Sequence, residues 1–287
     1  MTPRRDFAAR DLGAGSHQRD DEPAGRDEQA AAPEPRGDDA PRDDAPREGA
    51  SADAPDPGPA PEAALALFGP ALPLAERYTA LLADAGVRRG LIGPREVPRL
   101  WERHVLNCAV VAELIPEGAD VIDIGSGAGL PGVVLGLLRP DLSITLLEPL
   151  LRRTVFLDEC VTALGLENVT VRRGRAEEMR RELRADVVTA RAVAPLPRLA
   201  GWALPLLRSG GNLLALKGEQ AEAELTAARS DLAKQRPCVA DVIRVGHGKV
   251  DPATTVVRVT VTAESDSAAS PRSQRAPGGR KKRGRKR

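Results

Sequence analysis

Short apolar segments and longer amphipathic segments alternate along the chain from about residue 119 to residue 261. The apolar segments are rich in Val, Ile, Leu and Thr, as expected of strands buried in a sheet. They predict strands at residues 119–124, 143–148, 168–172, 186–190, 212–216, 239–245 and 255–261. Most of the segments between them carry apolar residues at helical spacing, and they predict helices at residues 130–138, 151–164, 195–207 and 219–234.

The order of these elements predicts the fold. Strands that alternate with helices form a doubly wound sheet whose strands are mostly parallel. The last two predicted strands have no helix between them, which favours an antiparallel pair. The sequence therefore predicts an α/β fold with a seven-stranded, mostly parallel sheet and one antiparallel edge strand.

Two amphipathic segments precede the first strand. Residues 72–85 carry Leu74, Tyr78 and Leu81 on one face, and residues 98–114 carry a second apolar stripe. Both segments predict helices. We therefore expect a small helical extension over residues 63–118, packed on a core domain over residues 119–263.

The two ends of the chain differ from this body in composition. Residues 1–62 are rich in Pro, Ala, Gly, Asp and Arg, with 16 acidic against 8 basic residues. Residues 271–287 contain 9 Lys and Arg and no acid. Neither end has the apolar side chains that would offset the entropy of ordering. We expect a disordered acidic head over residues 1–62 and a disordered basic tail over residues 264–287, an asymmetry that the formal net charge of +1 conceals.

Several classes of protein are excluded by what the sequence lacks. No segment is long and apolar enough to suggest a membrane span. Arg4 and Arg5 are not followed by an apolar run, which excludes a twin-arginine export signal. Cys108, Cys160 and Cys238 are odd in number and far apart, so they suggest neither a disulfide framework nor a zinc site. We expect a cytoplasmic protein without metal or membrane association.

A glycine-rich turn follows the first predicted strand. The chain from Asp123 to Gly132 reads Asp-Ile-Gly-Ser-Gly-Ala-Gly-Leu-Pro-Gly, and glycines allow positive φ and a close approach of the backbone to a ligand. The amides that begin the next helix favour an anionic group. A tight turn without a ligand is one interpretation, and Gly127, Gly129 and Gly132 also fit the dinucleotide pattern G-x-G-x-x-G. With Asp123 two residues before Gly125, the segment instead resembles the Asp-x-Gly-x-Gly-x-Gly pattern of S-adenosylmethionine (AdoMet) methyltransferases. We expect the Asp123 carboxylate to point at the mouth of the pocket.

Further polar residues stand where other strands end. Glu148 ends the second strand and suits hydrogen bonds to a ribose diol, although it could instead cap the following helix. Ala176 and Glu177 follow the third strand, where an acid and a backbone amide could hold an adenine. Arg191 and Lys217 end the fourth and fifth strands. Because the carboxyl ends of parallel strands meet at one edge of a sheet, we expect these residues to surround one pocket.

The chain also contains a set of short motifs that belong together. They are Arg103-His104-Val105-Leu106, the glycine-rich turn, Arg139-Pro140, Leu146-Leu147-Glu148 with Arg153 and Phe156-Leu157, Arg175-Ala176-Glu177, Arg191-Ala192 and Ala215-Leu216-Lys217-Gly218. Over about residues 70–262 the chain resembles the RsmG family, also called GidB, of bacterial 16S rRNA (guanine-N7) methyltransferases. It departs from the family at Asn107-Cys108, where the family usually has Asp followed by Ser. The resemblance implies a Rossmann-like class I methyltransferase fold and AdoMet as the cofactor. The implied target is guanosine 527, in the usual rRNA numbering, in the decoding region.

The site residues follow from the strand ends and from this resemblance, which implies cofactor contacts at Gly125, Leu130, Ala176, Glu177 and Arg191. The predicted cofactor-binding set is Asp123, Gly125, Gly127, Gly129, Leu130, Glu148, Ala176, Glu177 and Arg191. Since RNA phosphates need cations, the predicted set for the substrate RNA is Arg103, His104, Arg153, Arg191 and Lys217.

Methyl transfer to N7 of guanine, the reaction implied by the resemblance, requires few catalytic groups. N7 of guanine carries a lone pair and no proton, so methyl transfer there is a problem of positioning and needs no general base. We therefore predict that no residue acts as a base. Arg191 would contact the cofactor and orient the base, Lys217 would hold a phosphate, and His104 would fix its helix to the sheet. We expect a monomer that acts on 16S rRNA within the small subunit. The alternatives are an AdoMet-dependent methyltransferase with a non-ribosomal substrate and a dinucleotide-binding module.

Overall fold

The computed structural model describes residues 56–262. The basic tail expected over residues 264–287 lies outside the described residues, and so does the acidic head apart from residues 56–62. Within the described part of the chain the first helix begins at Glu62. No helix of this part is long and apolar enough to cross a membrane.

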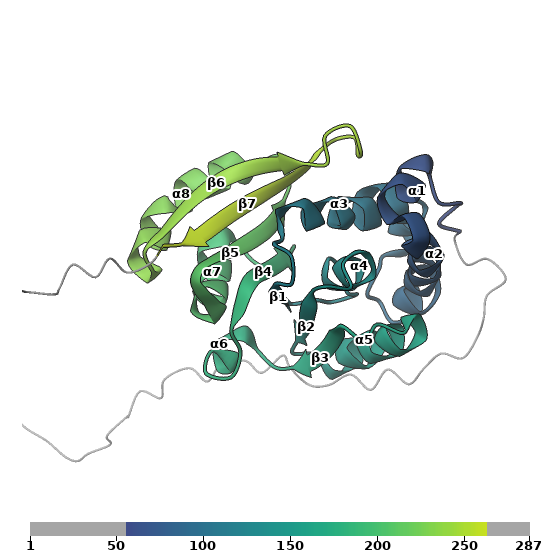
Figure 1. The fold of residues 1–287 in the computed structure, drawn as a ribbon, viewed down its shortest axis with the longest axis horizontal. Helices are drawn as coiled ribbons and strands as arrows, with labels where there is room; N and C mark the ends of the chain where they lie inside the picture. Colours follow the sequence, from purple (N-terminus) through teal and green to yellow (C-terminus); the bar gives the residue numbers. More distant parts are fainter. Residues whose placement is uncertain (1–55, 263–287) are drawn as a thin grey trace, which may run out of the picture. The chain divides into compact units, whose positions relative to one another are not determined.

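A seven-stranded sheet forms the centre of the fold (Figure 1), with the strand order β3-β2-β1-β4-β5-β7-β6. Its strands are β1 (Asp120–Ile124), β2 (Ser143–Glu148), β3 (Val169–Arg173), β4 (Ala185–Arg191), β5 (Leu207–Lys217), β6 (Cys238–Val245) and β7 (Thr254–Val261). The strands β1 to β5 pair with one another in parallel, and β7 is antiparallel to both β5 and β6. The predicted fold class, a mostly parallel sheet of seven strands with helices, is confirmed.

The position of the reversed strand corrects one detail of that prediction. The antiparallel strand was expected at the edge of the sheet, but β7 lies one place inside it and β6 forms the edge. The reason is the short connection over residues 246–253, which allows β7 only to fold back alongside β6. The returning strand pairs on its other side with β5, from Asn212 opposite Thr260 to Lys217 opposite Thr255.

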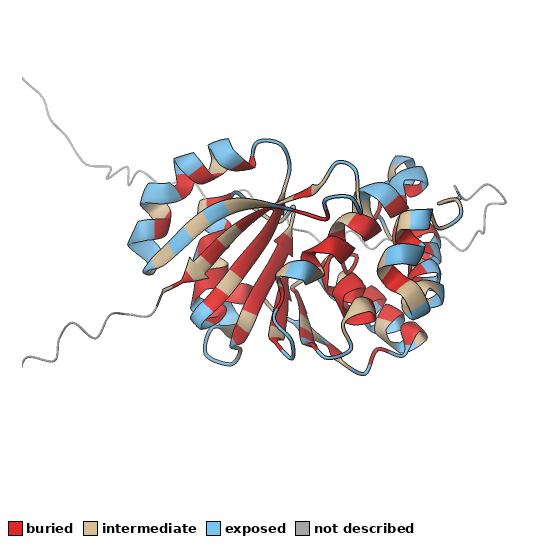
Figure 2. Ribbon diagram, turned by 45° about the horizontal axis from the view of Figure 1, so that its top comes forward, coloured by how far each residue is buried: buried red, intermediate tan, exposed pale blue. Residues whose placement is uncertain are grey.

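Helices cover both faces of the sheet. They are α1 (Glu62–Phe68), α2 (Leu72–Leu81), α3 (Leu106–Ala109), α4 (Gly132–Leu138), α5 (Leu151–Leu164), α6 (Ala176–Met179), α7 (Leu196–Ala203) and α8 (Ala221–Gln235). Alternate residues of each strand point to opposite faces. Val121 and Val187 therefore pack with α2–α5, while Ile122 and Val188 pack with α7 and α8. Figure 2 shows the buried residues running along the central strands between these two layers.

The helical extension is less regular than its sequence predicts. The predicted helix at residues 72–85 is α2 followed by a wide π turn from Leu82 to Gly86. The helix predicted from residue 98 starts earlier, at Pro94, and alternates between 3-10, π and α geometry before it ends at Leu114. Pro98 lies inside its first segment and cannot donate a backbone hydrogen bond, which favours such irregular turns. The short helices α1 and α6 were not predicted.

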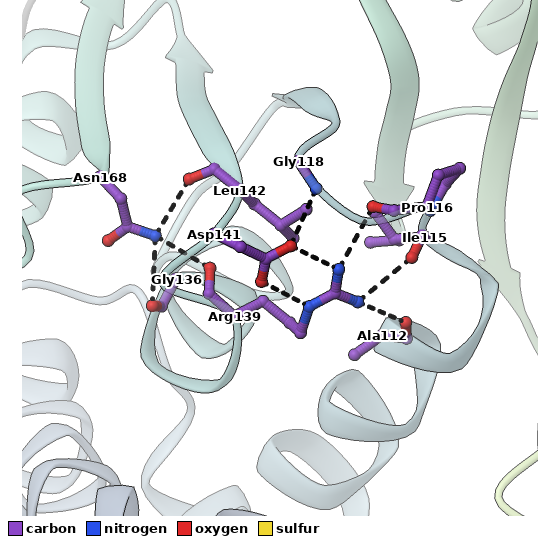
Figure 3. A network of polar contacts seen from close by, with 9 residues as sticks. All are labelled: Ala112, Ile115, Pro116, Gly118, Gly136, Arg139, Asp141, Leu142 and Asn168. Atoms are coloured by element: carbon purple, nitrogen blue, oxygen red, sulfur yellow. Dashed lines mark hydrogen bonds and ion pairs between the residues drawn. The ribbon is translucent and has the colours of Figure 1, made fainter.

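A polar cluster closes the carboxyl end of α4 (Figure 3). The guanidinium of Arg139 forms two hydrogen bonds of 2.7 Å with the carboxylate of Asp141, which also accepts one from the amide of Gly118. Arg139 further donates to the carbonyl oxygens of Ala112, Ile115 and Pro116. The side-chain amide of Asn168 donates to the carbonyl oxygens of Gly136, Arg139 and Leu142. These two side chains satisfy carbonyl groups that the ends of two helices leave open.

Candidate active site and cofactor cavity

A cavity of about 620 Å³ lies at the carboxyl ends of the parallel strands. Ligands of doubly wound folds bind at this edge. Nine of the residues predicted from the sequence line it, namely Gly125, Gly127, Leu130, Glu148, Ala176, Glu177, Arg191, His104 and Arg153. Asp123, Gly129, Arg103 and Lys217 are not part of its wall. The structure therefore brings most of the predicted residues together from segments far apart in the sequence.

The glycine-rich turn needs its glycines for two different reasons. Gly125, Gly127 and Gly129 have φ values of +64°, +57° and +98°, which side chains other than glycine rarely adopt. At Gly127 an added Cβ would have no atom closer than 3.7 Å, so only the backbone conformation requires glycine. At Gly129 it would lie 2.5 Å from Val133 and 2.9 Å from the Tyr78 hydroxyl, so packing excludes it as well.

Asp123 supports this turn from beneath, and its predicted orientation was wrong. Its carboxylate was expected to point at the mouth of the pocket, but it is fully buried and faces α4. It accepts hydrogen bonds from the Gly132 amide at 3.2 Å and from the Thr189 hydroxyl at 2.9 Å. Burial raises the pKa of Asp123 to about 7, although these hydrogen bonds oppose the shift. Strand alternation explains the orientation, because Asp123 shares a face with Val121.

Glu148 lies in the cavity wall with only 1% of its surface exposed. One carboxylate oxygen accepts the Gly127 amide at 3.0 Å, and the other accepts the Leu150 amide, just ahead of α5, also at 3.0 Å. Glu148 therefore fits both interpretations made from the sequence. It lies in the cavity, where it could bind a ribose, and it accepts a hydrogen bond from the segment that begins the next helix. Arg153 places a guanidinium nitrogen 3.6 Å from this carboxylate.

The cavity fits the cofactor that the sequence implies. The Nε of Arg153 is buried and has no hydrogen-bond partner within the described residues, which leaves one donor for a ligand. Apolar surface is added to the cavity wall by Pro149 and Leu150, which follow β2, and by Ala176, which follows β3. Ligand cavities typically combine apolar walls with a few convergent polar groups. An acid for a ribose diol, a free donor and a glycine turn are the groups that AdoMet requires.

Arg191 is held at the cavity by a chain of side chains. Its guanidinium contacts Nδ1 of His104, and Nε2 of His104 lies 2.8 Å from the carboxylate of Glu96. Burial, followed by the charge of Arg191, lowers the pKa of His104, so the ring is neutral. A neutral ring that donates from Nε2 to Glu96 presents an acceptor at Nδ1 to the guanidinium. Both ring nitrogens are thus occupied.

Two further contacts hold the same arginine. Arg191 donates to the sulfur of Cys108 at 3.5 Å and to the carbonyl oxygen of Arg103 at 3.4 Å. Ala192, the next residue, has a φ of +54° and lies in the cavity wall. A residue without glycine's freedom holds this conformation only where its surroundings fix it, and such residues are frequent at functional sites.

Three cations of the sequence motifs lie beside acidic side chains in the structure. The Lys217 ammonium lies 2.8 Å from the Glu224 carboxylate and 3.2 Å from the Ala194 carbonyl oxygen, so the phosphate role proposed for it does not fit its surroundings. Arg139 belongs to the cluster at the far end of α4. Arg103 is exposed and lies 3.4 Å from Glu96. In each case the local sequence does not reveal which acid the fold brings nearby.

The sequence interpretation missed several residues of the site. Glu96 is eight residues before His104 in an irregular helix, and no local pattern pointed to it. Cys108 was noted as a scattered cysteine and as a departure from the family pattern, but not as a partner of Arg191. Tyr78 was assigned to the apolar face of a helix, yet its hydroxyl reaches the glycine turn. Within the part of the chain that the structure describes, no group of His, Cys, Asp and Glu could hold a metal ion.

The fold and this cavity define a Rossmann-like, AdoMet-dependent methyltransferase. A family model described as rRNA small subunit methyltransferase G, GidB, matches residues 71–249, and the chain belongs to this family. The predicted family, methyltransferase function and cofactor are confirmed.

Two relatives show how close this relationship is. The chain is 76% identical over 229 residues to ribosomal RNA small subunit methyltransferase G of Thermobifida fusca, a match that covers 79% of this chain and 97% of that protein. The protein of the same name from Streptomyces avermitilis is 62% identical over 204 residues, covering 71% of this chain and 86% of the relative. Among solved structures, precorrin-6y C5,15-methyltransferase from Geobacter metallireducens matches at 17% identity with a TM-score of 0.40, over 55% of this chain and 87% of that one.

Proposed function

We propose that this protein transfers the methyl group of AdoMet to N7 of a guanosine in 16S rRNA, and that the target is guanosine 527 in the decoding region. The observation that carries the proposal is the engagement of both ring nitrogens of His104, the histidine in the cavity wall. A methyl acceptor that must lose a proton would need a free base at this place. N7 of guanine has none to lose.

The other titratable groups of the cavity support the same conclusion. Both oxygens of Glu148 accept backbone amides. Glu177 is exposed, in the first turn of α6. The site is therefore suited to holding two reactants in line rather than to moving protons, and such positioning is itself a large source of rate.

The roles on the cofactor side follow from the geometry. AdoMet, when bound, supplies a methyl group on a positively charged sulfur. Gly125, Gly127 and Leu130 would bring the backbone against it, Glu148 would accept hydrogen bonds from its ribose, and Ala176 with Glu177 would lie at its adenine. Gly129 and Asp123 would act from behind the turn, through packing and hydrogen bonds.

The roles on the substrate side rest on fewer side chains than the sequence suggested. Arg191 would orient the guanine edge, held by His104, while Arg153 in the cavity wall and the exposed Arg103 outside it would lie near the RNA backbone. Lys217 would act indirectly. It pairs with Glu224, and the same Glu224 oxygen accepts the Leu196 amide at 2.7 Å, which fixes the loop after Arg191. We place the reaction in the cytoplasm, with one copy of the chain acting on an assembled small subunit.

The test is to map N7 methylation in 16S rRNA by cleavage after borohydride and aniline treatment. RNA would come from cells that lack the gene, and from such cells carrying the wild-type chain, Gly127→Val or Gly165→Val. Gly165 ends α5 with a φ of +65° and is not part of the cavity wall, which makes it the matched control. Cleavage at guanosine 527 is expected with the wild type and Gly165→Val only. Cleavage there in the deletion cells would contradict the proposal.

A further inference from the structure

The helical extension reaches the glycine-rich turn through one side chain. Tyr78 lies on α2, fifty residues before the turn, and is fully buried. Its hydroxyl donates a hydrogen bond of 2.8 Å to the carbonyl oxygen of Ala128, which lies in the cavity wall. The helix itself packs against α4 and α5 on the same face of the sheet (Figure 1).

The peptide between Ala128 and Gly129 is held from two sides: its N–H donates a hydrogen bond of 2.6 Å to the Ser126 carbonyl oxygen, and its carbonyl oxygen accepts from Tyr78. Gly127 and Gly129 flank Ala128 and can rotate to either sign of φ at little steric cost. Rotation about these two residues would swing the Ala128 carbonyl group away and rearrange the backbone that faces the cofactor. The Tyr78 hydroxyl, fixed by a buried ring, stabilises one of these orientations. It also lies where a side chain on Gly129 would have to go, 2.9 Å from an added Cβ.

The hydroxyl is a permanent donor in this position. Burial raises the pKa of Tyr78 well above its ordinary value, and the nearby Asp123 carboxyl adds to the shift. The phenol therefore keeps its proton over the whole physiological range.

We propose that Tyr78 is a positioning residue of the cofactor site, which sets the orientation of the Ala128 peptide and thereby the shape of the glycine turn. The inference rests on the proposed cofactor site and adds a role for the helical extension, whose helix α2 carries the residue. The extension then contributes to cofactor affinity without touching the cofactor.

Thr79, the next residue, provides the control. Its hydroxyl is also buried, 1% exposed, and donates at 2.8 Å to a carbonyl oxygen, but that of Ala75 in its own helix. Tyr78→Phe and Thr79→Val each remove one buried hydroxyl from α2. Only the first removes a hydrogen bond to the turn.

The experiment is calorimetric titration of the full chain with S-adenosylhomocysteine, together with steady-state kinetics on small subunits. Tyr78→Phe is expected to raise the Kd on the order of tenfold and to raise the KM for AdoMet while leaving the KM for subunits unchanged. Thr79→Val should leave all three constants at their wild-type values. Equal affinities for the two variants, whether both weakened or both unchanged, would overturn the inference.

Gly127→Val separates this test from a failure of the cofactor site itself. If Gly127→Val still binds S-adenosylhomocysteine as the wild type does, the proposed site is wrong. If Gly127→Val loses binding and Tyr78→Phe matches Thr79→Val, the site stands and the role of Tyr78 is wrong.

A second measurement needs no substitution that could unfold the protein. Tyr78 is the only tyrosine of the chain, so biosynthetic 3-fluorotyrosine gives a single fluorine resonance at this residue. That resonance is expected to shift during titration with S-adenosylhomocysteine and to saturate with the calorimetric Kd. A resonance that stays in place while the ligand raises the Tm would also overturn the inference.

Discussion

The two ends of helix α4 use polar groups in opposite ways. At its carboxyl end, Arg139 and Asn168 bind carbonyl oxygens with almost every donor they have, and Asp141 neutralises the guanidinium (Figure 3). At its amino end, the glycine turn presents backbone to a cavity, and it is held by Asp123 and Tyr78 from behind and by Glu148 in the cavity wall. One end is closed by its own side chains, whereas the other is left open to a ligand. The cofactor cavity lies at this amino end of α4.

This difference also decides which cations can serve the substrate. Arg139 is a cation of one of the sequence motifs, but its donors are already used. Arg191 keeps its guanidinium in the cavity wall because its partners are a neutral histidine, a thiol and a carbonyl oxygen. The charge of Arg139 is compensated by the Asp141 carboxylate, whereas Arg191 has no ion pair with an acid among the described residues, and this difference separates the two.

The largest effect is expected at the open end. In Gly127→Val a β-branched side chain must adopt a φ near +57°, which the turn can accommodate only by changing shape. Binding of S-adenosylhomocysteine should fall by at least about a hundredfold. Gly165→Val carries the same strain at a φ of +65° away from the cavity and should lose stability but not affinity. Calorimetry on the pair measures this, and equal affinities would contradict a cofactor site at the turn.

At the closed end a large loss of stability is expected without a specific loss of function. Arg139→Gln removes an ion pair and hydrogen bonds to three carbonyl oxygens, and should lower the free energy of unfolding by about 2–4 kcal/mol. The control is Arg208→Gln, because Arg208 pairs with Asp120 and Asp186 but is 42% exposed. That change should cost less than about 1 kcal/mol. Urea unfolding measures both, and a loss of RNA affinity in a stable Arg139→Gln protein would refute the structural role.

Asp123, at the amino end of α4, and Asp141, at its carboxyl end, are expected to change the stability of the protein with pH in opposite directions. Burial raises the pKa of Asp123 from 3.8 to about 7, so between these values the folded carboxyl keeps a proton that the unfolded one has lost. Its contribution to stability is full below the unfolded pKa and is lost as the pH rises through about 7. The Arg139 guanidinium and the Gly118 amide hold the pKa of Asp141 well below its usual range. Its contribution is present above the usual pKa and is lost as the pH falls.

Unfolding of the wild type, Asp123→Asn and Asp141→Asn across the acid and neutral range separates the two. The wild type should lose stability relative to Asp123→Asn as the pH rises from about 4 to about 8. Relative to Asp141→Asn it should lose stability only as the pH falls below about 4. Differences that do not change with pH would show that neither carboxyl titrates as described.

The smallest effect is expected from Glu96, which reaches the cavity only through His104. Glu96→Gln keeps a side chain of the same shape but weakens the preference for the His104 tautomer that accepts from Arg191. The single-turnover rate should fall by roughly three- to tenfold, as for one charge-assisted hydrogen bond. Glu102→Gln, an exposed acid of the same irregular helix, is the control. A rate as low as that of Arg191→Ala would mean that Glu96 acts more directly.

Periodicity predicted the regular elements well and the irregular ones poorly. The predicted bounds of β2 and α5 agree with the structure, because β2 is a short segment rich in β-branched and apolar residues and Gly165 ends the helix. Residues 94–114 depart from a regular helix because their packing, not their local preference, decides each turn. The start of β5 at Leu207 was missed, since Gly210 and Gly211 look like a break but lie within the strand.

The site was predictable wherever it depends on strand ends and not where it depends on contacts between distant segments. The glycine turn, Glu148 and Arg191 come from local sequence, and the topology alone brings them together. The orientation of Asp123 could have been read from its parity with Val121 along the strand. The partners Tyr78 and Glu96 approach through tertiary packing, and one sequence carries no local signal for such contacts.

The central claim is that this site positions two reactants and contains no working base. Single-turnover methylation of small subunits at saturating AdoMet, followed from about pH 6.5 to about pH 8.5, tests it most directly. The account predicts a rate that is nearly constant across this range in the wild type and in His104→Gln, whatever its absolute value. A rate that rises tenfold per pH unit in the wild type and loses that slope in His104→Gln would contradict it.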